Sequence, residues 1–251
     1  MRKMQKFVLT ALIAISLSAC GATKETPGSG ITQVEKEMES DMTKMGFDQT
    51  YIKKEGVDVI YLAGGCFWGL EKLMQSIPGV VSAVSGYANG SADLVPTYTK
   101  VTTGLTGYRE TVRVEYKPDV ISLDAILFSY FQVIDPSIEN AQGNDIGTQY
   151  QTGVYYADEA ARATMERIVA IEKERHEVFV VEIEALERFY DAEEYHQNYL
   201  DKNPQGYCHI SRSEISIISE MLVDPGDYQR PSEEQIKAML TKQQYQVTQE
   251  A

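Results

Sequence analysis

The chain has 251 residues, 43% of them hydrophobic and 24% charged, a composition that excludes a disordered or collagen-like chain. Its formal net charge is -14, from 23 basic and 37 acidic residues, so a phosphate backbone would be repelled and no nucleic-acid partner is expected. Three cysteines are too few for a disulfide scaffold. With only three histidines beside them, no metal site is expected.

The first 19 residues have the pattern of a secretory signal peptide. Three basic residues precede an apolar run over 7–15, which is too short to span a membrane. The segment 17–20, Leu-Ser-Ala-Cys, resembles a bacterial lipobox, which implies that Cys20 becomes the lipidated amino terminus. The alternative is an ordinary cleaved signal with a coincidental cysteine. The pattern favours an extracytoplasmic bacterial lipoprotein, held at a membrane by its lipid anchor.

Residues 20–56 are predicted to form the lipidated terminus and a tether. The segment 27–30 is Pro-Gly-Ser-Gly, a flexible composition. Beyond it, Met38, Met42 and Met45 stand at helical spacing in a charged stretch, which indicates a short amphipathic helix that packs on the domain.

Strands and helices alternate through the body of the chain. We expect, in chain order, a strand at 57–63, a helix from 66 to 74, strands at 80–84 and 110–116, a helix at 123–134, a strand at 152–156, a helix at 158–175 and a strand at 181–185. There is no sustained βαβ repeat and no glycine fingerprint for a nucleotide. The pattern predicts a single α+β domain over residues 57–213.

Cys66 is a candidate nucleophile because it stands where the first strand passes into a helix. Unpaired backbone N–H groups and the helix dipole at such a position favour the thiolate. A buried structural cysteine would fit the position equally well, but the glycines on both sides of Cys66 indicate backbone that approaches a ligand closely. The adjacent Phe67 and Trp68 form either an apolar wall beside the sulfur or part of the core.

Glu110 stands at the end of the apolar face of the third predicted strand. Strand parity places it with Val112 and Val114, and places Arg109 on the opposite face. Burial there would raise the pKa of the carboxyl and make it a proton donor near neutral pH. A strand-end glutamate that reaches solvent is an equally open interpretation.

Six segments, in the same order, resemble the A-type peptide methionine sulfoxide reductases. They are Gly65-Cys66-Phe67-Trp68-Gly69, Gly86-Tyr87-Ala88, Gly107-Tyr108-Arg109-Glu110 and the segments at 143–150, 194–197 and 202–208. The resemblance covers nearly all of residues 57–210, and six ordered segments are far more specific than one motif. It implies a two-layer mixed sheet-and-helix domain with a ferredoxin-like core.

The resemblance also implies the roles of the site residues. Cys66 would attack the sulfur of a methionine S-sulfoxide, and Glu110 would protonate its oxygen, because that oxygen leaves only when protonated. The residues implied to bind the substrate, by orienting its oxygen or holding its methyl group, are Phe67, Trp68, Tyr87, Asp145 and Tyr150. His196 is expected to be a packed, hydrogen-bonded histidine rather than a base.

Cys208 is the implied resolving cysteine. After methionine leaves, Cys66 would be a sulfenic acid, with which Cys208 condenses to a disulfide. A loop cysteine with no partner is the alternative. Repeated turnover on oxidised proteins or peptides would then need no bound cofactor, only an extracytoplasmic thioredoxin-like reductant. The competing functions are a two-cysteine thiol peroxidase or disulfide exchanger and a solute-binding lipoprotein.

Residues 214–251 are expected to be a linker followed by the truncated start of a second domain. The segment from Pro231 has the pattern of a helix that begins with a capping box. Residues 240–250 resemble the opening of the B-type reductase domain that is found fused behind A-type domains. The family often has His-Ala where this chain has Tyr108-Arg109, so entry to the pocket is expected to differ.

Overall fold

A computed structural model of the protein describes residues 48, 50–227 and 231–249. The predicted signal peptide, the lipidation site at Cys20 and the methionine-containing helix lie outside the described residues.

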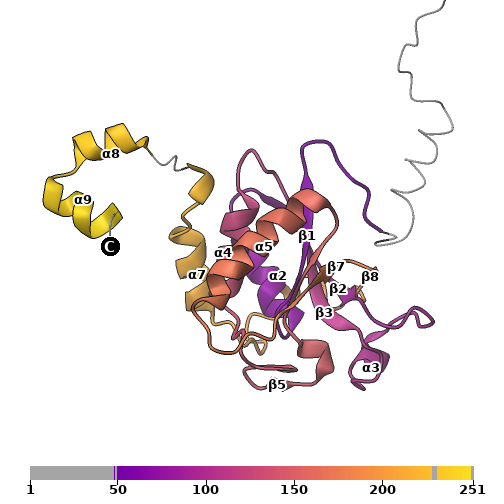
Figure 1. Cartoon of the computed structure of the whole chain (residues 1–251). Helices are drawn as coiled ribbons and strands as arrows, with labels where there is room; N and C mark the ends of the chain where they lie inside the picture. Colours follow the sequence, from indigo (N-terminus) through magenta and orange to yellow (C-terminus); the bar gives the residue numbers. More distant parts are fainter. Residues whose placement is uncertain (1–47, 49, 228–230, 250–251) are drawn as a thin grey trace, which may run out of the picture. The chain divides into compact units, whose positions relative to one another are not determined.

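A six-stranded sheet carries the fold, with helices packed on it (Figure 1). Its strands, in spatial order, are β7 (Glu182–Ala185), β6 (Gly153–Tyr156), β1 (Asp58–Ala63), β3 (Arg109–Tyr116), β2 (Val80–Ala88) and β8 (Phe189–Asp191). The helices of the body are α2 (Phe67–Ser76), α3 (Tyr98–Val101), α4 (Leu123–Phe131), α5 (Glu159–Lys173), α6 (Tyr199–Lys202) and α7 (Arg212–Glu220). A small hairpin of β4 (Ala141–Gln142) and β5 (Asp145–Ile146) precedes a short 3₁₀ turn, Thr148–Tyr150.

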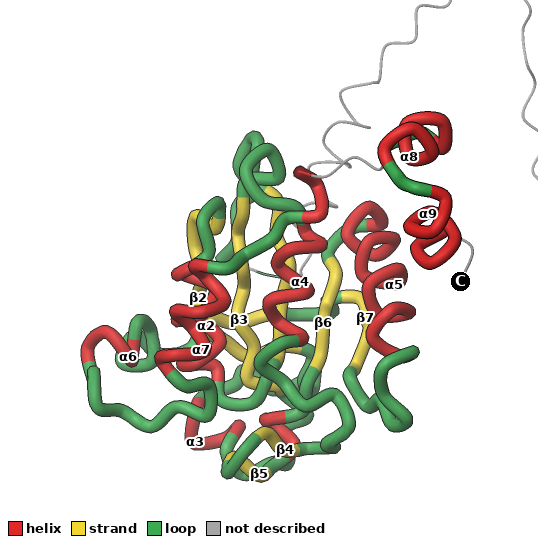
Figure 2. Tube along the Cα trace, turned by 90° about the vertical axis from the view of Figure 1, so that its left-hand side faces the viewer, coloured by secondary structure: helices red, strands yellow, loops and turns green. Residues whose placement is uncertain are grey.

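The four central strands and two helices form a ferredoxin-like core. In chain order this core runs β1, α2, β2, β3, α4 and β6, and its strands pair antiparallel in the order β6-β1-β3-β2. At one edge β7 adds in parallel to β6, and at the other β8 adds antiparallel to β2. Figure 2 shows α2, α4, α5 and α7 on one face of the sheet. The predicted α+β domain, two-layer and mixed, is confirmed.

The two faces of β3 are both buried. Val112 and Val114 point into the core under the helices, as strand parity predicts. On the opposite face the Arg113 guanidinium bonds Asp48 at 2.6 Å and Asp191 at 2.9 Å, and its own side chain is 7% exposed. Removing one partner of such a buried ion pair typically costs about 3–5 kcal/mol, because a charge is left unpaired. Asp48 is therefore held against the far face of the sheet.

The folded body is longer than the predicted range 57–213. Asp48, expected in the tether, packs on the sheet as described above. At the other end Ile215 and Ile218 of α7 are buried in the main core, and the carboxylate of Asp224 accepts a hydrogen bond from Ser122 N at the start of α4. The sequence predicted a linker from residue 214 onward. A short helix that packs on the core and one that is exposed can have the same composition, and only their tertiary contacts distinguish them.

Strand β2 continues to Ala88, beyond the predicted end at 84. It pairs with β3 on one side and with β8 on the other, and these ladders hold residues 85–88 extended. Gly86 allows this because a Cβ there would lie 2.2 Å from the Phe189 ring. The extension carries Tyr87 into the sheet opposite Glu110.

Residues 231–249 form two helices, α8 (Glu233–Met239) and α9 (Lys242–Gln249). The predicted capping box is confirmed: Ser232 Oγ accepts from Gln235 N, and the Gln235 side chain accepts from Ser232 N. Among the helices that the structure describes, none is both long enough and apolar enough to cross a membrane.

Candidate active site

A glycine turn places Cys66 at the start of α2. After β1 ends, Gly65 adopts φ +77°, and a Cβ at this position would lie 2.6 Å from the Cβ of Gln142. Both the left-handed conformation and the lack of space require glycine. Cys66 is then the N-cap residue of the helix, and it is 6% exposed.

The thiol of Cys66 is held protonated in the substrate-free site, which corrects the expectation of a thiolate. Burial and the neighbouring Glu110 carboxylate raise the pKa of the Cys66 thiol well above its ordinary value. The Trp68 N–H of the first helical turn lowers the pKa, as a helix amino terminus should. Its contribution is smaller because the sulfur is almost completely removed from solvent.

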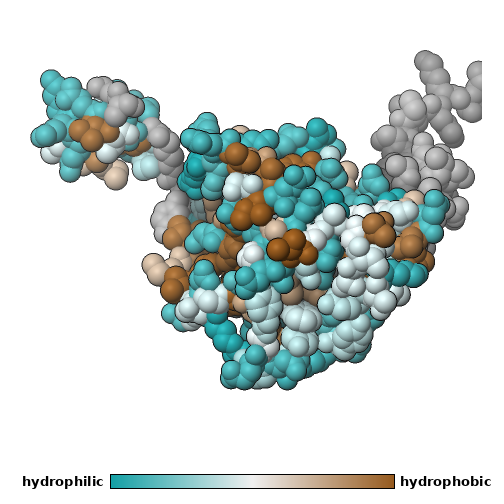
Figure 3. All heavy atoms as spheres, turned by 90° about the horizontal axis from the view of Figure 1, so that it is seen from below, coloured by the Kyte–Doolittle hydropathy of each residue, from teal (hydrophilic) through white to brown (hydrophobic). Residues whose placement is uncertain are grey.

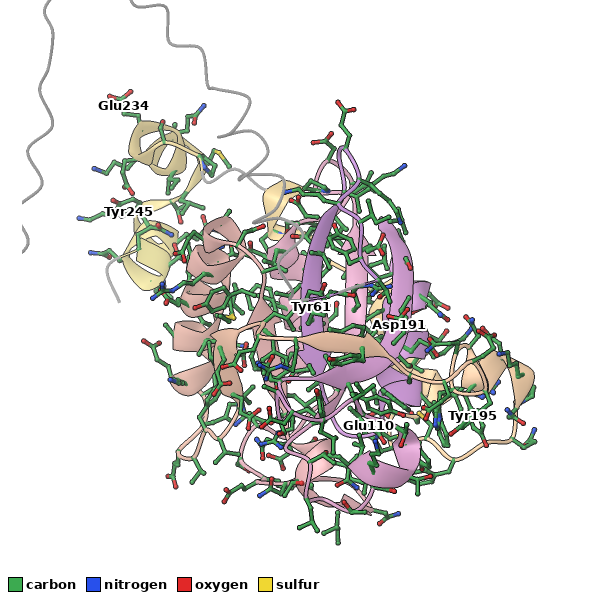
Figure 4. All side chains as sticks on the ribbon, turned by 90° about the vertical axis from the view of Figure 1, so that its right-hand side faces the viewer. Tyr61, Glu110, Asp191, Tyr195, Glu234 and Tyr245 are labelled. Carbon is green, nitrogen blue, oxygen red and sulfur yellow. The ribbon has the colours of Figure 1, made fainter. Side chains whose placement is uncertain are left out.

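Glu110 is a buried carboxyl directly against the same helix start. Its side chain is 2% exposed, and Oε2 accepts a hydrogen bond from Phe67 N at 3.1 Å. Burial raises the pKa of Glu110 to about 8, and the charge of Asp145 contributes to this rise. The hydrogen bond from the Phe67 N–H lowers the pKa but does not outweigh burial. The carboxyl is therefore protonated at neutral pH and can donate a proton. Figure 4 shows Glu110 toward the lower end of the sheet.

Two tyrosines share the surroundings of Cys66 and Glu110. Tyr150 ends the 3₁₀ turn, and Tyr98 begins α3. Burial raises the pKa of both phenols, and the charges of Glu110 and Cys66 raise them further. The sequence argument missed Tyr98. Its position after a proline and a threonine signals a helix start, but nothing in the sequence brings that helix to Glu110.

Tyr87 makes a hydrogen bond that its predicted role does not include. It is the cross-strand partner of Glu110, but its hydroxyl donates to Glu193 Oε2 at 2.8 Å. Glu193 Oε1 in turn accepts from Tyr98 N at 2.8 Å. Tyr87 thus holds Glu193, and Glu193 holds the start of α3. The sequence could not predict this because Glu193 arrives from a distant loop.

Asp145 and His209 form a buried polar pair beside the glycine turn. Asp145 Oδ2 lies 3.7 Å from His209 Nδ1, and neither atom has a hydrogen-bond partner among the residues that the structure describes. Burial raises the pKa of the Asp145 carboxyl and lowers that of the His209 imidazole. The ring of His209 also approaches Gly65: a Cβ there would lie 3.2 Å from its Cε1. Hydrogen-bonding capacity for a polar ligand atom therefore remains at this point.

Aromatic side chains follow Cys66 in the first turn of α2. Phe67 is completely buried, and Trp68 is partly buried. The indole of Trp68 stacks on Tyr199, with ring centroids 3.7 Å apart and planes 12° apart. Phe67 packs against Tyr87 at 5.9 Å. The residues that follow Cys66 are therefore apolar and aromatic rather than charged.

Cys208 lies over the first turn of α2. Its Sγ occupies the place beside Gly69, where a Cβ would lie only 2.6 Å from it. Both cysteines are free thiols, and Cys208 is among the groups that raise the pKa of Cys66. A second thiol is therefore close to the candidate nucleophile.

Arg109 lies on the face opposite Glu110, as predicted. Its guanidinium bonds Glu182 at 2.8 Å, and Glu182 also accepts from the Tyr155 hydroxyl at 2.6 Å. The basic residue beside the candidate acid is thus fully engaged elsewhere. Within the described part of the chain no cluster of three or more His, Cys, Asp or Glu is arranged to hold a metal ion.

Comparisons with known proteins found a family profile and solved structures that are similar to this chain. The family profile that matches the chain is described as peptide methionine sulfoxide reductase, and the match spans residues 58–221. Reduced Mxr1 from Saccharomyces cerevisiae is a similar solved structure, with 36% identity, a TM-score of 0.61, and coverage of 64% of this chain and 94% of that chain. Methionine sulfoxide reductase A of Corynebacterium diphtheriae also has 36% identity, with a TM-score of 0.58 and coverage of 62% and 79%.

Proposed function

The chain belongs to the peptide methionine sulfoxide reductase family and reduces methionine sulfoxide, and from this premise we propose that it acts on the S epimer in oxidised proteins outside the cytoplasm. The two sulfoxide epimers need separate enzymes, and the motifs around Cys66 and Glu110 are those of the A type. The observation that carries the mechanism is the protonated, buried carboxyl of Glu110 on the amide of Phe67.

In the first step Cys66 attacks the sulfoxide sulfur while Glu110 protonates the sulfoxide oxygen. Tyr150 and Tyr98 are proposed to donate to that oxygen, because the charges of Glu110 and Cys66 raise the pKa of both phenols. Asp145, whose charge raises the pKa of Glu110, is proposed to border the same space. A protonated Glu110 also removes one of the charges that oppose the Cys66 thiolate. The oxygen passes to Cys66, so that the thiol and the sulfoxide become a sulfenic acid and methionine.

In the second step Cys208 condenses with the sulfenic acid. A Cys66–Cys208 disulfide forms and the oxygen leaves as water. The position of Cys208 beside Gly69 supports this role. An external dithiol of the thioredoxin class then exchanges with the disulfide, becoming oxidised as both cysteines return to thiols. A bound cofactor is not required.

Exposed apolar side chains near the site support a polypeptide substrate. Ile146, directly after Asp145, is 81% exposed, and Leu105 is 89% exposed. The hydrogen bond from Thr148 Oγ1 to Gly104 O, at 2.8 Å, joins the loops that carry them. Figure 3, which views this end of the molecule, shows separate apolar patches between polar side chains. Such patches suit unfolded segments around an oxidised methionine.

The test is a turnover assay with resolved epimers of a methionine sulfoxide peptide and a thioredoxin-type donor. Reduction of the S epimer alone is expected. Reduction of the R epimer at a comparable rate would contradict the proposal. Reduction of hydroperoxide in preference to either epimer would favour the peroxidase alternative, which has no need of Glu110.

We also propose that the mature protein is a lipoprotein anchored through Cys20. The support is the basic, apolar and Leu-Ser-Ala-Cys pattern of residues 1–20. A thioredoxin-like donor must then be available on the same side of the membrane. The mass of the mature amino terminus tests the anchor: an unmodified Cys20 would contradict it. Residues 240–250 are proposed, on resemblance, to be the opening of a B-type domain.

Cys208→Ser is expected to form one methionine per enzyme and then stop. The serine cannot condense with the sulfenic acid, so the external donor finds no disulfide to reduce. The measurement is the burst of methionine per active site, with mass spectrometry of the oxidised wild type. Sustained thioredoxin-driven turnover by this variant, or an oxidised wild type without the Cys66–Cys208 peptide pair, would show another route of resolution.

A further inference from the structure

The segment 207–210 carries the second thiol along the start of α2. Two of its side chains, those of Cys208 and Ile210, face Gly69 of this helix. A Cβ at Gly69 would lie 2.6 Å from Cys208 Sγ and 3.3 Å from Ile210 Cδ1. Ile210 is 2% exposed and belongs to the main core. The chain is therefore fixed to the core two residues after Cys208.

The side chain between these two, that of His209, fills a space beside two other glycines. A Cβ at Gly143, in the turn between β4 and β5, would lie 3.2 Å from His209 Cβ. A Cβ at Gly65 would lie 3.2 Å from His209 Cε1. The His209 side chain is only 5% exposed. We call this space, bordered by Gly65 and Gly143, the histidine seat. With His209 in its seat and Ile210 in the core, Cys208 is left to face α2.

The chain before Cys208 restrains the thiol much less. Residues 203–206 form a turn, closed by the hydrogen bond from Gly206 N to Asn203 O at 2.8 Å. Residues 203–205 of this turn are exposed. Their composition, Asn-Pro-Gln, is that of a surface turn. The position of Cys208 is therefore set mainly by the two residues that follow it.

The seat holds His209 by its shape rather than by an ion pair. Burial lowers the pKa of the His209 imidazole, although the charge of Asp145 raises it, so the ring is neutral at neutral pH. Asp145 Oδ2, 3.7 Å from Nδ1, is beyond hydrogen-bond distance. Both ring nitrogens are buried, and neither meets the geometry of a hydrogen bond with a described residue. A ring of similar size without nitrogen atoms should therefore occupy the same space.

We propose that His209 is a positioning residue for the second step: its ring, in the histidine seat, holds the thiol of Cys208 where it meets the sulfenic acid of Cys66. The inference rests on the proposed roles of the two cysteines. In this step the two sulfur atoms bond, the S–O bond of the sulfenic acid breaks, and its hydroxyl leaves as water with the proton of the Cys208 thiol. Without the seat, Cys208 would search a larger space, and the effective concentration of its thiol beside Cys66 would fall.

Two substitutions test the seat, and a third is their matched control. His209→Ala empties the seat, His209→Phe refills it with a ring, and Gln205→Ala changes an exposed residue on the other side of Cys208. All three should give the methionine burst of the wild type, because Cys66 and Glu110 are unchanged. Disulfide formation after the burst should be roughly 10–100-fold slower in His209→Ala, the usual cost of a misplaced reacting group. It should stay close to the wild-type rate in His209→Phe and Gln205→Ala.

The measurement is a quenched single turnover of an S-sulfoxide peptide without reductant. Methionine reports the first step, and mass spectrometry of the Cys66–Cys208 peptide pair reports the second. A sulfenic acid that accumulates between them is counted by labelling with dimedone, and His209→Ala should accumulate it. Equal rates of disulfide formation in wild type and His209→Ala, or equal slowing in His209→Ala and His209→Phe, would overturn the proposal. If His209→Ala fails to fold, His209→Leu, which leaves the seat partly empty, replaces it with the same two outcomes.

A readout independent of sulfoxide comes from equilibrium with glutathione. Oxidised glutathione forms the Cys66–Cys208 disulfide and is itself reduced, and the equilibrium constant measures the effective concentration of one thiol beside the other. This constant should fall roughly 10-fold in His209→Ala and stay near the wild-type value in His209→Phe. An unchanged or raised constant in His209→Ala would overturn the seat. If the wild type forms the disulfide but no methionine, the proposed function fails while the seat is still tested, so the two failures are distinguishable.

Discussion

Cys66→Ser is expected to abolish methionine formation while the protein remains folded. The serine hydroxyl cannot attack sulfur under these conditions, and the whole covalent route is lost rather than an orienting contact. A serine hydroxyl can still accept from the Trp68 N–H at the start of α2 and is similar in size to the thiol, so a melting temperature close to that of the wild type is expected. The measurement is product per active site with an S-sulfoxide peptide.

Cys208→Ser serves as the matched control for this variant. It removes the other thiol of the body but leaves the first step, and should still give one methionine per enzyme. If folded Cys66→Ser keeps activity near that of the wild type, Cys66 is not the nucleophile.

Glu110→Gln is expected to slow the reductive step by roughly 10²–10⁴-fold, the usual worth of a positioned general acid. The amide oxygen of glutamine can still accept from Phe67 N, so the shape of the site should persist while the transferable proton is lost. Single-turnover rates at saturating sulfoxide measure the step directly. A rate within a few-fold of wild type would exclude Glu110 from proton donation.

The pH profile gives a second test of Glu110. Its pKa is about 8, so the acid form is present below this pH and the wild-type rate should fall as the pH rises through it. Stability should change in the same direction. Folding raises the pKa from its ordinary value of 4.5, so the stabilisation is complete below about 4.5 and is lost as the pH rises through about 8. Glu110→Gln should lack both changes, measured as rates and as melting temperatures.

The features of the site that depend on neighbouring residues in the sequence could be predicted. Strand parity placed Glu110 toward the core, and the glycines placed Cys66 at a helix start, because both inferences depend only on neighbouring residues. The expectation of a Cys66 thiolate was wrong. The helix terminus, which lowers the pKa of the thiol, can be predicted from the local sequence. Burial and the charge of Glu110, which raise that pKa, are set by tertiary packing. Tyr98 and the contact of Tyr87 with Glu193 were missed for the same reason.

The fold shows a similar division. The α+β class and most elements follow from periodicity, and the ferredoxin-like order was expected only through the family resemblance. The limits of the body were set too narrowly, because Asp48 and α7 belong to it through contacts with distant residues such as Arg113. Amino-acid composition near a boundary does not report such contacts.

Gly69 makes the second half of the proposed catalytic cycle depend on one missing side chain. Any Cβ at this position would compete with the sulfur of Cys208 for the same space. A larger residue would leave oxygen transfer to Cys66 intact and displace the thiol that completes the cycle. Such an enzyme would reduce one sulfoxide per molecule and then stop, so it would be a stoichiometric reagent instead of a catalyst. In the proposed cycle, recycling, and with it the link to the electron supply of the cell, would therefore depend on a glycine that takes no part in any bond to the substrate.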